Sequence, residues 1–261
     1  MEERGEKKMQ LWEHLEELRI TLFKIIGAIT CTTIVSFYFV QQLYDALMRP
    51  VSLLQQAHPE FQVKVIYSGP FDPVFVVMKI AFLGGILLGF PLVMLFLWSF
   101  IAPALKKREH HAFFWICGTG SFSFAAGVTL GYFSVAPILN ILTGFGMQGA
   151  DNFWKIGDFI SFMLYWLLCT GMIFELPLVI VILTKIGVVE IALLKRIRPF
   201  VFIGSMIFAA IITPPDPITM AMIGGPLVLL YELGILIAAL GQRRNRASSG
   251  GEDDPLLENS D

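Results

Sequence analysis

The apolar run VFVVMKIAFLGGILLGFPLVMLFLWSF, from Val74 to Phe100, decides the fold of this chain. It holds 27 residues and one charged side chain, Lys79. A helix needs about 20 apolar residues to cross the roughly 30 Å hydrocarbon core of a bilayer. Backbone groups in hydrocarbon must hydrogen bond within the segment, so we expect this run to be a membrane-spanning helix.

Five further apolar blocks surround this run, at residues 20–40, 112–138, 159–183, 199–212 and 218–240. The chain is 56% hydrophobic and 15% charged, with a mean hydropathy of +0.70. Soluble domains are nearer 45–50% apolar and about 25% charged. No alternating pattern of strand length favours a barrel. The sequence therefore predicts an all-α polytopic protein with six transmembrane helices in one membrane domain, residues 1–241, followed by a disordered cytoplasmic tail, residues 242–261.

The lysines and arginines set the predicted orientation. With the N-terminus inside, the inner segments hold 14 of them and the outer segments hold 3, while Lys24 and Lys79 lie within spans. Cytoplasmic loops carry an excess of Lys and Arg, so both termini should be cytoplasmic. We expect a multi-pass protein of the cytoplasmic, or inner, membrane.

The last two blocks are short and closely joined. Residues 199–212 make about 21 Å of helix at 1.5 Å per residue, less than the hydrocarbon thickness. The connection, Thr213-Pro214-Pro215-Asp216-Pro217, is stiff because it contains three prolines. A short fifth and sixth helix in a locally thin bilayer is one interpretation. The other is that the span extends into polar flanks such as Arg198, whose side chain can snorkel.

Several functional classes lack their usual residues. Cys31, Cys117 and Cys169 lie in apolar blocks, so no disulfide framework is expected. His110 and His111 are adjacent and do not face each other on a helix, and no metal-ligand spacing occurs. Nucleotide and hydrolase motifs are missing, and no basic face suits nucleic acid. We therefore expect no metal, no cofactor, no nucleic-acid partner and no enzyme activity.

Acidic residues mark two regions. In Leu11 to Arg19, LWEHLEELR, an apolar stripe lies opposite Glu13, Glu16 and Glu17, as in an interfacial helix that leads into the first span. These acids form either a solvated face or a docking site for a cationic partner. Glu109, beside three basic residues, forms either a local ion pair or part of such a site.

Within the membrane, Glu175 and Glu232 lie about 15 Å and 12 Å from the inner helix ends, at 1.5 Å per residue. Buried acids are costly, and they serve either helix packing or function. Pro177 should kink the helix beside Glu175. The spacing of Gly85 and Gly89 predicts close helix packing.

Four segments resemble the signature segments of the TatC family, core subunits of the twin-arginine protein translocase. They are His14-Leu15-Glu16-Glu17-Leu18-Arg19, Phe100-Ile101-Ala102-Pro103-Ala104-Leu105, Phe174-Glu175-Leu176-Pro177 and Thr213-Pro214-Pro215-Asp216. The resemblance covers about Leu11 to Leu240 in order.

The resemblance implies a receptor for twin-arginine signal peptides and a translocase core that moves folded proteins outward, driven by the proton-motive force. It assigns peptide binding to Glu17 and Glu109, with Arg19, Phe100 and Pro103 nearby. It matches Glu175 to a buried acid on a concave face and Asp216 to an acid of the outer hairpin. The additional acids Glu13 and Glu16, and the His110-His111 pair, depart from the family pattern.

The implied partners are signal peptides of folded precursors, single-span subunits of the TatA and TatB type, membrane lipid and further copies of the chain. A proton-coupled small-solute transporter, with Glu175 and Glu232 as a relay, remains an alternative function. The lack of an internal repeat and the short last helices weigh against it. An intramembrane enzyme is a third possibility, but no nucleophile and base pair is present.

Overall fold

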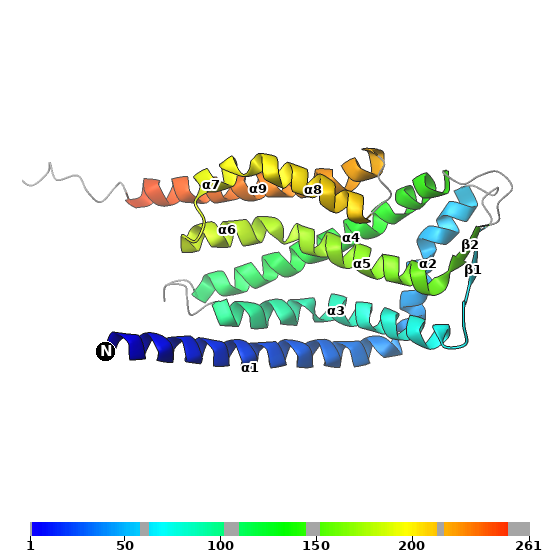
Figure 1. The fold of residues 1–261 in the computed structure, drawn as a ribbon, viewed down its shortest axis with the longest axis horizontal. Helices are drawn as coiled ribbons and strands as arrows, with labels where there is room; N and C mark the ends of the chain where they lie inside the picture. The colour runs from blue at the N-terminus through cyan, green and yellow to red at the C-terminus, as the bar shows by residue number, and fades with distance from the viewer. Residues whose placement is uncertain (1, 58–62, 102–109, 145–151, 213–216, 250–261) are drawn as a thin grey trace, which may run out of the picture. The chain divides into compact units, whose positions relative to one another are not determined.

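A computed structural model describes residues 2–57, 63–101, 110–144, 152–212 and 217–249 (Figure 1). The chain divides into two compact units, Met1–Met172 and Ile173–Asp261. The first unit contains α1 (Glu2–Tyr38), α2 (Val40–Ala57), β1 (Val63–Ile66), α3 (Asp72–Ile101), α4 (His110–Gly144), β2 (Asn152–Lys155) and most of α5 (Ile156–Phe174). The second contains α6 (Leu176–Ile186), α7 (Ile191–Arg196), α8 (Arg198–Ile212) and α9 (Pro217–Ser249).

Five stretches in the described residues are long and apolar enough to cross a membrane: Leu15–Tyr38, Asp72–Phe100, Trp115–Gly144, Ile156–Ile186 and Gly224–Gln242. A shorter apolar helix runs over Arg198–Ala210. This predominantly helical pattern confirms the predicted fold class. This shorter helix coincides with the fifth apolar block of the sequence. Counted together with the five long stretches, it is compatible with the predicted total of six spans.

The helix bounds differ from the apolar blocks in two places. α1 is one continuous helix from Glu2, so the expected interfacial helix and first span are a single element. α9 continues to Ser249, eight residues past residue 241, where the expected membrane domain ends. Residues 250–261 of the expected tail lie outside the described residues. The single-domain expectation for residues 1–241 stays a prediction.

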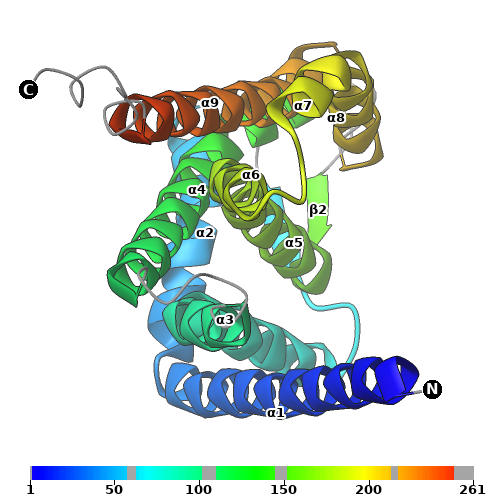
Figure 2. The same cartoon turned by 90° about the vertical axis from the view of Figure 1, so that its left-hand side faces the viewer.

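α1 and α3 lie side by side in both views of the fold (Figures 1 and 2). The hydroxyl of Thr32 donates to the carbonyl of Gly85 at 2.7 Å. A Cβ added to Gly85 would meet Cα of Thr33 at 2.6 Å, and one added to Gly89 would meet Oγ1 of Thr32 at 2.7 Å. The Gly-x-x-x-Gly pair therefore permits the close helix approach that its spacing predicts.

Other contacts within the first unit join α4 to its neighbours. The indole N–H of Trp166 on α5 donates to the carbonyl of Gly131 on α4 at 2.9 Å and to Oγ of Ser134 at 3.1 Å. The hydroxyl of Tyr132 donates to the carbonyl of Ala46 on α2 at 2.7 Å. These bonds satisfy polar groups between helices, where the lipid would offer no partner.

The outer segment contains α2 and a small sheet. β1 pairs with β2 in parallel, with Val63 opposite Asn152 and Ile66 opposite Lys155. Burial raises the pKa of the Tyr44 phenol on α2 above its ordinary value, and the neighbouring Tyr67 and Asp45 add to this shift. A higher pKa keeps the phenol protonated, so Tyr44 is neutral near pH 7.

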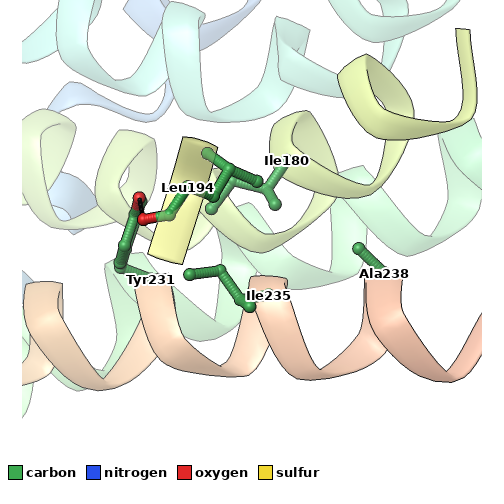
Figure 3. Close-up of a cluster of buried hydrophobic side chains, with 5 residues drawn as sticks. All are labelled: Ile180, Leu194, Tyr231, Ile235 and Ala238. Atoms are coloured by element: carbon green, nitrogen blue, oxygen red, sulfur yellow. Dashed lines mark hydrogen bonds between the residues drawn. The ribbon is translucent and has the colours of Figure 1, made fainter. Parts of the chain in front are cut away.

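In the second unit, α6, α7 and α8 all pack against α9. The contacts of α6 and α7 with α9 are formed by a buried cluster (Figure 3). Its members are Ile180, Leu194, Tyr231, Ile235 and Ala238. The Tyr231 hydroxyl donates to the carbonyl of Leu194 at 2.8 Å, which ties α9 to the short α7. α6 ends at Ile186 and is followed by Gly187, whose φ of 84° is the left-handed conformation that favours glycine at a helix end.

Candidate functional site

The acidic N-terminal segment lies on α1. The side chain of Glu17 is exposed on this helix. The neighbouring Glu16 accepts a bond from Nη1 of Arg19 at 3.5 Å, one helical turn away, and both side chains are more than half exposed. An exposed pair of this kind contributes about 0–1 kcal/mol and does not fix the side chains strongly. Arg19 thus partly offsets the charge of Glu16.

Phe100 lies in the last turn of α3 and is half-buried. α3 packs along α1, the helix that carries Glu17. Pro103 and Glu109 of the predicted peptide-binding set lie outside the described residues, as does Asp216 of the predicted outer hairpin. Their roles stay predictions.

Glu175 lies at the junction of α5 and α6, and its side chain is 7% exposed. Pro177 occupies the first turn of α6, where a missing N–H costs nothing. Because α5 ends at Phe174 and α6 begins at Leu176, the predicted span 159–183 consists of two helical pieces. The predicted kink beside Glu175 stays a prediction. The acid lies at the break between the two helical pieces.

α9 packs against the first turns of α6. A Cβ added to Gly234 would meet Cα of Pro177 at 3.0 Å and Cδ1 of Ile180 at 2.8 Å. The small residue on α9 therefore lets the two helices approach directly beside the turn that follows Glu175.

Glu232 has a partner that the sequence did not indicate. Its Oε2 accepts a bond from Nη2 of Arg198 at 2.6 Å, and the two side chains are 41% and 45% exposed. A charge-assisted bond of this kind is stronger than a hydrogen bond between neutral groups. This bond joins the start of α8 to α9.

Lys79 also has partners that the sequence did not indicate. Its ammonium group donates to Oγ of Ser161 at 2.7 Å and to the carbonyl of Gly157 at 3.2 Å, so it joins α3 to α5. Neither bond was predictable, since each partner lies about 80 residues further along the chain. Among the described residues, no group of three or more metal-ligating side chains gathers.

The long apolar helices define a polytopic α-helical membrane protein. It carries acidic residues on α1 and within two of its spans. This class includes receptors, channels and translocases. Comparison with known proteins narrows it.

Residues 13–226 match the model of the family described as Sec-independent protein translocase protein (TatC), so this chain belongs to the TatC family. TatC of Carboxydothermus hydrogenoformans is 32% identical over 89% of this chain and 94% of its own. TatC of Deinococcus radiodurans is 34% identical over 87% of this chain and 85% of its own.

A solved structure shows the same fold. The crystal structure of a twin arginine translocase receptor, TatC, has a TM-score of 0.77 and 31% identity, and it covers 88% of this chain and 100% of its own. The protein is a polytopic inner-membrane component of the Sec-independent protein translocase, and thus a transport protein. This finding favours the translocase over the small-solute transporter.

Proposed function

We propose that this chain is the receptor for twin-arginine signal peptides and the core around which the translocase assembles. The observation that carries the proposal is the exposed carboxylate of Glu17 on the long α1 helix, in a segment that resembles the signal-peptide site of the family. The related crystal structure is described as that of a twin arginine translocase receptor, which supports the same assignment.

The recognition chemistry follows from the guanidinium group. Two adjacent arginines present two planar forks, and each fork can form a bidentate, charge-assisted bond with a carboxylate. Glu17 supplies one carboxylate, and Glu109 supplies the second in our proposal. A lysine is a point charge without a fork, so a Lys-Lys peptide should bind less well. Phe100, Pro103 and Arg19 line the neighbouring surface in this proposal.

Each exposed ion pair contributes only about 0–1 kcal/mol. The apolar part of the signal peptide must therefore supply most of the affinity, by packing on the lipid-facing surface of the span. The arginine pair then provides specificity. This division predicts that salt weakens the discrimination between the two peptides more than it weakens total binding.

The experiment is a binding titration of the purified full chain in detergent with a labelled twin-arginine signal peptide and with its Lys-Lys counterpart. Glu17→Gln and Glu109→Gln should each remove most of the preference for arginine, because each deletes one carboxylate of the pair. Glu190→Gln is the matched control, since Glu190 is an exposed acid before α7, outside the proposed site.

Equal binding of both peptides by the unchanged chain would contradict the receptor proposal. Loss of preference in all three variants alike would show a general charge effect in place of a site. The result that supports the proposal is a loss confined to the first two variants.

We further propose that Glu175 acts after peptide binding. It is a buried acid at the break between α5 and α6 within a span, which is costly unless it serves a function. Single-span partner subunits of the TatA and TatB type, and further copies of the chain, would assemble around this helix, with the proton-motive force as the energy source. Glu175→Ala should abolish transport into energised vesicles and leave peptide binding intact. A loss of peptide binding in that variant would contradict the order of steps.

A further inference from the structure

A cavity of about 520 Å³ lies in the first unit, where α4 ends and β2 leads into α5 (Figure 1). Pockets that hold whole small molecules usually measure about 300–1,000 Å³, so the cavity has room for a ligand of that size. Aromatic side chains form one of its walls. The rings of Trp154 and Phe159 stack with their centroids 6.1 Å apart, and the centroids of Phe159 and Phe162 are 6.4 Å apart. The aromatic wall therefore runs from β2 into the second turn of α5.

Two charged side chains, Lys155 and Asp158, also line the cavity, and both are exposed. In the part of the chain that the structure describes, neither forms an ion pair with the other or with a third residue. Each can therefore bind a group of opposite charge on a ligand through a charge-assisted hydrogen bond. Together they carry no net charge, so a ligand with one positive and one negative group matches them better than a simple anion does.

The charged groups lie at the outer end of this cavity. The Lys and Arg distribution predicts that α5 begins at the outer face of the membrane and runs inward. Asp158 is in the first turn of α5, and helix side chains tilt toward the start of their helix, so its carboxylate points toward the outer surface. Phe162 comes four residues later, about 6 Å deeper at 1.5 Å per residue.

α4 contributes an apolar side chain on the same inner side of the charged groups. By the same prediction this helix runs outward, so Leu139, which lines the cavity, lies about 6 Å deeper than Thr143 near the helix end. Hydrocarbon attached to a bound ligand would thus extend from the charged groups toward the bilayer centre. Trp154, which precedes Lys155, is of the residue type that membrane interfaces favour. The cavity therefore has the order of a lipid, with charge outside and hydrocarbon inside.

We propose that this cavity binds a zwitterionic phospholipid of the outer leaflet, whose headgroup joins a phosphate to an ammonium group. The side-chain ammonium group of Lys155 donates to the phosphate, and the carboxylate of Asp158 accepts from the ammonium group of the lipid. Trp154 contacts the glycerol, and the first methylene groups of the acyl chains lie against Phe162 and Leu139. The site goes beyond the proposed signal-peptide site on α1 and does not depend on it.

The test is photolabelling of the delipidated full chain in a non-ionic detergent. The probes are phosphatidylethanolamine and phosphatidylglycerol, each with a diazirine near the glycerol end of one acyl chain. Mass spectrometry gives the yield of labelled peptides that contain Leu139 or Phe162, so lipid bound at other basic surfaces is not counted. We expect a higher yield with phosphatidylethanolamine, because phosphatidylglycerol brings only a negative group to Asp158.

Substitutions of the two charged residues should have different effects. Asp158→Asn should lower the yield with phosphatidylethanolamine and raise it with phosphatidylglycerol, because it removes an attraction to the first lipid and a repulsion of the second. Lys155→Gln should lower both yields, since both lipids carry the phosphate. Each change should reach up to about fivefold, the upper range for one exposed ion pair. The matched controls are Asp45→Asn and Arg49→Gln, at exposed residues of α2 that do not line the cavity, and they should change neither yield.

Four outcomes would overturn the proposal. Equal yields of the two lipids in the unchanged chain would reduce the cavity to an apolar contact. Lower yields of both lipids in a folded Asp158→Asn protein would contradict the charge argument. Equal effects of Lys155→Gln and Arg49→Gln would indicate unspecific attraction to the surface. Full protection by millimolar phosphoethanolamine, which has no acyl chains, would show that the site takes a free solute. If Lys155→Gln fails to fold, the opposite responses of the two lipids to Asp158→Asn still decide between these outcomes.

Discussion

Gly85 has no room for a methyl group. Its missing Cβ would lie 2.6 Å from Cα and 2.8 Å from N of Thr33, both backbone atoms that cannot rotate away. Alanine in place of glycine usually stabilises an exposed helix by up to about 1 kcal/mol. Here the clash must outweigh this gain, because the two helix backbones have to separate.

We therefore expect Gly85→Ala to lower the unfolding temperature in detergent. Gly118→Ala on α4 is the control, since a Cβ there meets nothing within 4 Å. It should leave the unfolding temperature unchanged or raise it slightly. If both substitutions stabilise the protein, the close contact between α1 and α3 does not exist in solution.

The hydrogen bond of Tyr231 can be tested by removing a single oxygen atom. Tyr231→Phe deletes the hydroxyl that donates to the carbonyl of Leu194 and leaves the ring in the buried cluster. The loss should cost about 1 kcal/mol, the typical net contribution of one hydrogen bond, with somewhat more if the carbonyl stays dry. Chemical denaturation followed by circular dichroism measures the change. Tyr165→Phe is the control, because Tyr165 is 66% exposed.

At the level of whole elements, α4 and α5 are joined by the indole of Trp166. Trp166→Phe removes bonds to the carbonyl of Gly131 and to Oγ of Ser134 and leaves a gap beside them. Two lost bonds and reduced packing should together cost about 2–4 kcal/mol. The unfolding temperature in detergent reports this loss. Trp115→Phe, at a tryptophan that is 78% exposed, should change little, and an equal drop would contradict the assignment.

The elements show which features sequence patterns can predict. Long apolar runs gave the membrane helices, because the bilayer requires about 20 apolar residues whatever the partners are. The polar ends of α1 and α9 could not be predicted in this way. Residues 2–14 and 242–249 carry no apolar run, and their helices continue from the spans beside them. Local composition does not record this continuation.

The candidate site shows the same limit. The acids Glu175 and Glu232 stood out because charge is rare inside apolar blocks. The bond from Arg198 to Glu232 joins residues 34 positions apart, and the bonds of Lys79 span 78 and 82 positions. These pairings depend on how the helices pack. A single sequence contains no signal for such contacts.

At the scale of the molecule in its membrane, α8 is shorter than the hydrocarbon core is thick. Its 15 residues make about 22 Å of helix, against a hydrocarbon core of about 30 Å. A mismatch of this size costs a fraction of a kcal/mol per Å, and thinning the bilayer relieves it. The protein should therefore prefer a thin membrane.

We expect the unfolding temperature in nanodiscs to rise as the monounsaturated acyl chains are shortened from the usual length. The other spans cover 19 to 31 residues and tolerate ordinary thickness. Transport into vesicles of the same lipids gives a second readout. A maximum at the longest chains would show that polar flanks such as Arg198 extend the span.

Because α1 runs from Glu2 to Tyr38 without a break, the part of it that lies in lipid fixes the orientation of its acidic face about the helix axis. Each residue turns an α-helix by about 100° and lengthens it by 1.5 Å. One alanine inserted after Ile20 would thus swing Glu17 to another side, while four would return it to within about 40°. Signal-peptide binding should fall with one insertion and recover partly with four. The rotation of α1 about its own axis therefore determines where an incoming signal peptide meets Glu17.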